Sequence, residues 1–175
     1  EVLSRGARQP PDPELCPRAL RLAEFRRDER RALVLSMRLT QLDSSDGAAA
    51  VTAMGLLIRA GQPERALIFA RTAKERGSRI NAPALMVSWD KLGPDRQRAT
   101  AKAIEALAID WPEDQDIAIA LAYLHRAQNS PDQALDVLGP VLDTNPDEER
   151  ALLLWTQIKL DQEAKQPFKR MRAAI

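Results

Sequence analysis

The chain has 175 residues, and its 26 Lys and Arg against 25 Asp and Glu leave a net charge of +1, so no overall basic field would draw it to nucleic acid or a membrane. Its residues are 45% hydrophobic but only 4% aromatic, and the apolar share is mostly Ala and Leu, which favour helices over strands. The single cysteine, Cys16, cannot form an internal disulfide and has no partner of a metal or redox motif. We therefore expect an all-α, soluble chain without cofactor or metal, cut from a longer protein and lacking a membrane-spanning segment.

Four short breaks follow one another along the chain, at 26–29, 61–63, 93–95 and 129–132, and an apolar helical stripe follows each break. Each stripe has a small residue early in it, at a constant spacing of 34 residues. These small residues are Ala32, Ala66, Thr100 and Ala134. A second register with the same spacing precedes the breaks, at Ala19, Ala53, Val87, Leu121 and Trp155. The spacing predicts two antiparallel helices per 34-residue repeat.

The predicted repeats span 13–46, 47–80, 81–114, 115–148 and 149–175, after a flank at 1–12 that is extended or flexible. Two residues before the ends of the first four repeats stand Ser44, Ser78, Pro112 and Pro146, and at the last two of these proline stops one helix and the following acids can cap the next. Acidic runs at 113–114 and 147–149 could suggest metal ligands, but their place at helix starts favours capping.

These residues resemble the tetratricopeptide repeat, whose motif has a large then a small residue midway along the first helix, a small residue early in the second, and proline at the end. The resemblance covers roughly Pro13 to Ile175, and it implies a right-handed α-solenoid whose first helices line a concave surface. The first repeat departs from the motif because Pro17 interrupts its expected first helix. The fifth departs at Phe168, so the array continues or ends in a divergent cap, with Phe168 and Met171 beginning a second helix.

Catalytic motifs are lacking, and we expect no enzyme: the chain contains no Gly-rich phosphate loop, no nucleophile motif and no His or Cys cluster. His125, the only histidine, falls where the family keeps an aromatic core residue. We interpret it as a packing residue rather than a proton-transfer group.

Binding is the remaining function, and two rows of first-helix positions would project into the concave surface. The first row consists of apolar residues at a spacing of 34, namely Val51, Leu85, Ile119 and Leu153. The second row has the same spacing and consists of Gly55, Trp89, Tyr123 and Gln157. Arg59 and Arg126 stand one turn beyond the second row and could donate hydrogen bonds at the rim of the surface. The first row could equally pack against the neighbouring repeat. Trp89 and Tyr123 are two of only seven aromatic residues and could contact a ligand. Family members that hold a C-terminal carboxylate use Lys and Asn in these rows, and neither occurs here.

Charge is unevenly spread: residues 1–104 contain 19 basic and 12 acidic side chains, residues 105–149 contain 1 and 11, and residues 150–175 contain 6 and 2. The acidic stretch is a solvated face, or it steers a basic partner or supports head-to-tail self-association. Our first hypothesis is an adaptor or scaffold that holds another protein or peptide on the concave surface. The alternatives are a structural spacer that assembles end to end and a binder of acidic ligands or RNA through the Arg-rich stretch 26–31.

Arginine outnumbers lysine 20 to 6, a bias associated with GC-rich bacterial genomes. Bacterial proteins of the resembled family often work in the cell envelope as adaptors or periplasmic scaffolds. The resemblance therefore implies an envelope location over a cytoplasmic one.

Overall fold

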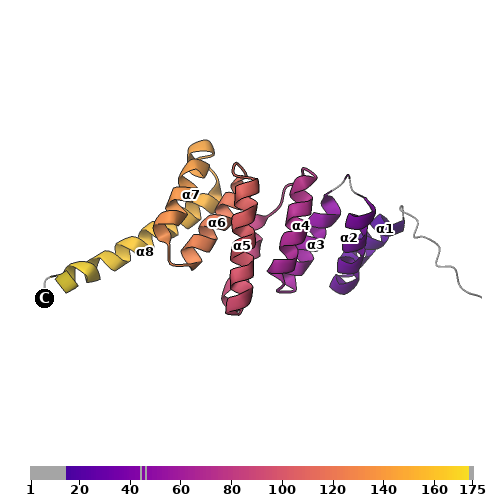
Figure 1. The fold of residues 1–175 in the computed structure, drawn as a ribbon, viewed down its shortest axis with the longest axis horizontal. Helices are drawn as coiled ribbons and strands as arrows, with labels where there is room; N and C mark the ends of the chain where they lie inside the picture. Colours follow the sequence, from indigo (N-terminus) through magenta and orange to yellow (C-terminus); the bar gives the residue numbers. More distant parts are fainter. Residues whose placement is uncertain (1–14, 44, 46, 174–175) are drawn as a thin grey trace, which may run out of the picture. The chain divides into compact units, whose positions relative to one another are not determined.

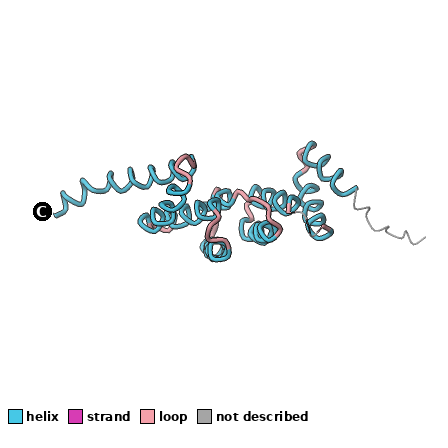
Figure 2. The backbone as a smooth tube through the Cα atoms, turned by 90° about the horizontal axis from the view of Figure 1, so that it is seen from above, coloured by secondary structure: helices cyan, strands magenta, loops and turns pink. Residues whose placement is uncertain are grey.

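A computed structural model describes the backbone of residues 15–43, 45 and 47–173, and the side chains of that set between residues 17 and 163. Within this part of the chain every regular element is a helix, with loops between them and no strand (Figures 1 and 2). The all-α prediction is confirmed. The chain divides into two compact units, an N-terminal unit that ends at Ile80 and a C-terminal unit that begins at Asn81.

The N-terminal unit consists of four α-helices, each of which packs against the next along the chain. They are α1 (Leu15–Phe25), α2 (Glu29–Leu42), α3 (Ala48–Arg59) and α4 (Pro63–Glu75) (Figure 1). The expectation that Pro17 interrupts the first helix was wrong. Pro17 lies in the first turn of α1, where a backbone N–H has no partner within the helix anyway, so the missing donor costs little.

Small side chains let the helices of this unit approach closely. Ala32 on α2 packs with Leu20, Ala23 and Leu56 in one buried cluster. Gly47, just before α3, shows how close the approach is, because a Cβ atom built on it would lie 2.9 Å from the Cβ of Ser78. No larger residue fits there without a shift of the backbone.

Four helix ends share one turn geometry, in which the second residue after the helix takes a left-handed conformation. Arg27, Gly61, Gly77 and Asn129 have φ values of 55°, 67°, 72° and 58°. In each turn the N–H of that residue donates three residues back, and the next N–H donates five residues back, as from Asp28 N to Ala23 O at 2.9 Å. Gly77 ends α4, whereas Arg27, Gly61 and Asn129 follow α1, α3 and α6 and stand 34 and 68 residues apart.

The C-terminal unit is built around α6, which contacts η1, α5, α7 and α8. Its elements are the 3₁₀ segments η1 (Ala82–Met86) and η2 (Trp89–Lys91) and the α-helices α5 (Pro94–Asp110), α6 (Gln115–Ala127), α7 (Pro131–Thr144) and α8 (Glu149–Ala173). The core joins α6, α7 and α8 through Ile119, Ala134, Leu138, Leu154 and Ile158. All four small residues of the 34-residue register are buried, which confirms their packing role.

Two elements of this unit differ from the sequence prediction. An α-helix was expected through Val87, but η1 and η2 occupy that segment and the Val87 side chain is 78% exposed. Pro83 at its start and Gly93-Pro94 at its end confine the segment to about ten residues, too short for a stable isolated α-helix. The second difference is α8, which continues without a turn to Ala173. The side chains of Phe168 and Met171 lie outside the described set.

Acidic residues at the helix starts of this unit cap one helix and form ion pairs with the start of another. The Asp114 carboxylate accepts a hydrogen bond from Ile117 N at 3.0 Å, which confirms the predicted capping role. Arg150 at the start of α8 lies 2.7 Å from Asp116 on α6 and 2.8 Å from Glu148. The hydrogen bond to Glu148, followed by the pair with Asp116, raises the pKa of Arg150.

Candidate interaction site

Three of the predicted groove residues line one cavity in the C-terminal unit. Trp89 on η2 and Tyr123 and Arg126 on α6 surround a hollow of about 280 Å³, together with Met86, Asp90 and Ala127. We call Trp89, Tyr123 and Arg126 the aromatic surface. Trp89 and Tyr123 are each half-buried, and both line this cavity.

Hydrogen bonds to the backbone fix the position of Trp89. Its carbonyl oxygen accepts from Leu92 N and from the Gln97 side chain on α5, each at 3.0 Å. The 3₁₀ segment is therefore tied to a helix rather than left as an open loop. Tyr123 is held differently, because its ring packs against the core cluster of α6, α7 and α8.

Arg126 reaches from α6 to α8. Its Nη1 donates to Gln157 Oε1 at 2.8 Å, and its Nη2 donates to Asp161 Oδ2 at 3.1 Å. Gln157 is another predicted groove residue, so four of the ten come together here. The pair with Asp161 offsets much of the Arg126 charge, which leaves the exposed Asp90 carboxylate as the less compensated charge at the cavity.

Arg126 also borders a second hollow of about 310 Å³, which we call the C-terminal hollow. It is lined by Arg126, Asn129, Pro131, Ile158, Asp161 and Gln162. The guanidinium group therefore stands between two depressions on the surface of one unit. A partner that displaced the Asp161 carboxylate would have access to both.

The first predicted row divides between core and surface. Leu85 is 1% exposed and Ile119 is 0% exposed, so both are core residues, as the packing alternative describes. Leu153 on α8 is 62% exposed and Val51 on α3 is half-buried. Only Leu153 of this row presents a large apolar side chain to a partner.

The remaining predicted residues lie in the N-terminal unit. Arg59 Nε is 2.8 Å from Glu29 Oε1, and both side chains are more than half exposed. Gly55, one turn earlier on α3, has open space around it, since the nearest atom to an added Cβ is Arg59 Nη1 at 3.9 Å. Arg59 borders a cavity of about 550 Å³, the N-terminal hollow, which is lined by Ala23, Glu24, Arg27, Glu29, Ala32, Leu56 and Arg59.

Sequence reasoning did not single out Asp90, Gln97 or Asp161. Asp161 follows Gln157 by one helical turn, so its place beside Arg126 could have been inferred from the spacing of α8. Asp90 and Gln97 depend on the 3₁₀ segment, which the periodicity did not predict. His125 on α6 is half-buried, and its buried Nδ1 has no hydrogen-bond partner in the described part of the chain.

No family model matches the chain, and a comparison with curated proteins finds no match. Among the described helices, none is long and apolar enough to cross a membrane. Among the side chains that the structure describes, no group of three His, Cys, Asp or Glu is placed to hold a metal ion. The function must therefore be argued from the cavities and their lining residues.

Proposed function

We propose that this chain is a protein-interaction module, an adaptor or scaffold, whose aromatic surface binds an extended segment of a partner protein. The observation that carries the proposal is the meeting of Trp89, Tyr123 and Arg126 around one open cavity. Tryptophan, tyrosine and arginine dominate the binding energy of protein interfaces because they combine a large apolar area with a polar end.

The support of these side chains favours binding over simple exposure. Gln97 ties the backbone of Trp89 to α5, Tyr123 packs against the core cluster, and the Arg126 side chain is held by Gln157 and Asp161. Groups that are already held in place lose little entropy when a ligand arrives. A cavity of about 280 Å³ is near the lower limit for a small-molecule site, and it has room for one apolar side chain of a peptide.

The charges around the cavity indicate the chemistry of the segment. Asp90 at the rim would attract a Lys or Arg of the partner, while the partner's backbone carbonyl groups could accept from Arg126. We therefore expect a segment with an apolar anchor next to a basic residue. A free carboxylate is not favoured, because Asp161 already occupies the guanidinium group.

We also propose that both units belong to one α-solenoid with a 34-residue repeat. The left-handed turns at Arg27, Gly61 and Asn129 support it, because their spacing is 34 and 68 residues. The two hollows give independent support. Five lining positions of the N-terminal hollow recur 102 residues later in the C-terminal hollow, which is three periods of 34. The boundary between the units, after Ile80, also coincides with a predicted repeat boundary.

A peptide selection tests the binding proposal. Peptides would be selected from a random displayed library on the immobilised chain, and the best one titrated by calorimetry. The double variant Trp89→Ala/Tyr123→Ala should weaken that peptide by at least ~30-fold, since aromatic anchors commonly contribute ~2 kcal/mol or more. The matched control is Asp136→Lys on the exposed side of α7, which should leave affinity within about twofold.

Circular dichroism of both variants serves as the folding check. A double variant that keeps its helix content and binds the peptide as tightly as the original chain would contradict the proposed site. Equal weakening by Asp136→Lys would move the site to the opposite side of the unit.

A further inference from the structure

The face of α6 opposite the aromatic surface borders a further cavity, which we call the acidic cavity. Ala118 and Leu121 point to this side, about half a turn away from Tyr123. The cavity measures about 610 Å³ and lies between α5, α6 and α7. It is lined by Ala108, Trp111, Pro112, Glu113, Asp114, Gln115, Ala118, Leu121, Val137, Pro140, Val141 and Thr144.

The lining combines apolar walls with an acidic edge. Leu121, Val137 and Trp111 offer apolar surface, and Glu113 and Asp114 stand at the rim. Asp114 is engaged in capping α6, whereas Glu113 is exposed. Residues 105–149 contain 11 acidic side chains and one basic one, Arg126, which lies on the other face of α6 and pairs with Asp161. Arg150 pairs with two of these acids, Asp116 and Glu148, and the exposed Glu113 carboxylate leaves the rim of this cavity negative.

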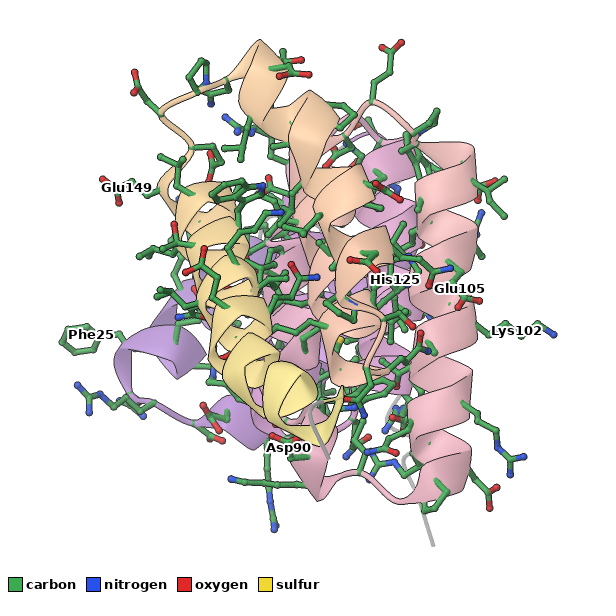
Figure 3. All side chains as sticks on the ribbon, turned by 90° about the vertical axis from the view of Figure 1, so that its left-hand side faces the viewer. Phe25, Asp90, Lys102, Glu105, His125 and Glu149 are labelled. Atoms are coloured by element: carbon green, nitrogen blue, oxygen red, sulfur yellow. The ribbon has the colours of Figure 1, made fainter. Side chains whose placement is uncertain are left out.

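A matching feature occurs in the N-terminal unit. Phe25, the last residue of α1, is 87% exposed and stands away from the ribbon into open space (Figure 3). Two exposed arginines, Arg26 and Arg27, follow it directly, and Leu22, 51% exposed, lies one turn before. Residues 18–31 contain six arginines against three acids. An exposed aromatic side chain among arginines is the complement of an apolar cavity with an acidic rim.

We propose that the acidic cavity binds Phe25 of a second copy of this chain, with Arg26 and Arg27 facing the acidic rim. The occupant is argued from complementarity, because the same sequence carries both the basic aromatic projection and the acidic apolar hollow. The two surfaces are different, so the contact is heterologous, and each copy retains one unused surface of each kind. Copies therefore add head to tail. This inference is independent of the peptide site, which lies on the other face of α6.

Sedimentation velocity of the full chain over about two decades of concentration tests the proposal. We expect the average mass to rise with concentration, and the rise to shrink when salt is raised from about 50 mM to about 500 mM, because exposed charges are screened. Phe25→Ala should lower the association constant at least ~10-fold, as expected for loss of an anchor side chain. The matched control is Val34→Ala, which removes another exposed apolar side chain, 65% exposed, from the same unit.

Mixing two variants distinguishes head-to-tail contact from other modes. Ala108→Trp would fill the cavity but leave Phe25 free, whereas Phe25→Ala leaves the cavity open. Each variant alone should associate at least ~10-fold more weakly than the original chain, and an equimolar mixture should form a dimer and no larger species. Glu113→Arg, at an exposed position, provides a second cavity variant should Ala108→Trp lose helix content by circular dichroism.

Four outcomes would overturn the proposal. The first is that the chain is monomeric at every concentration, and the second is that Phe25→Ala, or both cavity variants, leave association unchanged. The third is that the mixture of the two variants does not form dimers. The fourth is that Val34→Ala weakens association as much as Phe25→Ala does. The variant Trp89→Ala/Tyr123→Ala should associate as the original chain does, which separates failure here from failure of the peptide site.

Discussion

The two hollows of this protein have corresponding positions but exchanged charges. In the N-terminal hollow an acid, Glu24, lies at the end of α1 and Arg59 lies on α3. In the C-terminal hollow Arg126 lies at the end of α6 and Asp161 lies on α8, each 102 residues later. In both units the arginine forms an ion pair, Arg59 with Glu29 and Arg126 with Asp161.

The difference separates the residues that determine the path of the backbone from those that determine only the charge of the surface. Small buried residues and left-handed turns recur in both units, whereas the rim charges exchange sign without changing the helix arrangement. The hollows also differ in depth. The N-terminal hollow reaches Ala23, and the position 102 residues later is the larger His125, which does not line the C-terminal hollow. A partner would therefore meet two hollows of similar outline and different charge and size.

The largest expected effect is overpacking at equivalent positions of the two units. Ala66 and Ala134 are both 0% exposed and 68 residues apart, so leucine at either should cost about 1–3 kcal/mol of unfolding free energy. Denaturant unfolding followed by circular dichroism measures the loss.

The control is Ala99→Leu, at an exposed position on α5, which should change stability by less than about 0.5 kcal/mol. A large loss at Ala66 with none at Ala134 would mean that the two units do not share a packing register.

A smaller difference is expected between the ion pairs of the two units. Arg150 bonds two carboxylates that are only 14% and 18% exposed, so Arg150→Gln should cost about 1 kcal/mol. Arg59 and Glu29 are 60% and 57% exposed, and Arg59→Gln should cost less than about 0.5 kcal/mol.

The pH dependence follows from the raised pKa of Arg150. A raised folded-state pKa gives a stabilisation that is complete below the unfolded-state pKa and lost only as pH rises through strongly alkaline values. The difference between the original chain and Arg150→Gln should therefore stay constant from about pH 6 to about pH 9. A difference that falls within this range would contradict the assignment.

The last predictions concern three of the left-handed turns, where each change should amount to about 1 kcal/mol or less. Gly61→Ala should cost about 1 kcal/mol, because φ of 67° is strained for a residue with a Cβ atom. Arg27→Gly and Asn129→Gly should each stabilise by up to about 1 kcal/mol, with the smaller gain at asparagine, which tolerates this conformation better. Thermal unfolding of the three variants gives the order. Destabilisation by Arg27→Gly would show that its side chain stabilises the N-terminal unit more than the strain costs.

Much of the helix arrangement was predictable because turn chemistry is local. Gly61-Gln62-Pro63 and Asn129-Ser130-Pro131 mark a helix end followed by a helix start, and the structure places α4 and α7 accordingly. The burial of Ala66 and Ala134 follows from their register on those helices. The spacing also put Trp89, Tyr123 and Arg126 near one another, and the structure places them around one cavity, although Trp89 lies on a 3₁₀ segment rather than on the expected α-helix.

The rest depends on contacts that helix periodicity does not contain. The segment around Trp89 has the register of an α-helix, yet its 3₁₀ form relies on packing against α6 and on Gln97 of α5. Leu85, Ile119 and Leu153 share a row. A side chain of this row is buried only where a neighbouring element packs over it, and the row itself does not say where that happens. Phe25 carried no signal at all, since exposure of one aromatic residue cannot be read from a helical stripe.

The placement of the tryptophans means that the intrinsic tryptophan fluorescence of the protein comes from one of its two units. All three, Trp89, Trp111 and Trp155, belong to the C-terminal unit, and the N-terminal unit has none. Trp89 borders the aromatic surface, Trp111 borders the acidic cavity, and Trp155 lies beneath the Lys159 ammonium group at 5.5 Å. Emission excited at the indole band therefore reports on one unit alone, while ellipticity reports on both. Noncoincident fluorescence and ellipticity curves in the same melt would reveal how independently the two halves lose their structure, without any label.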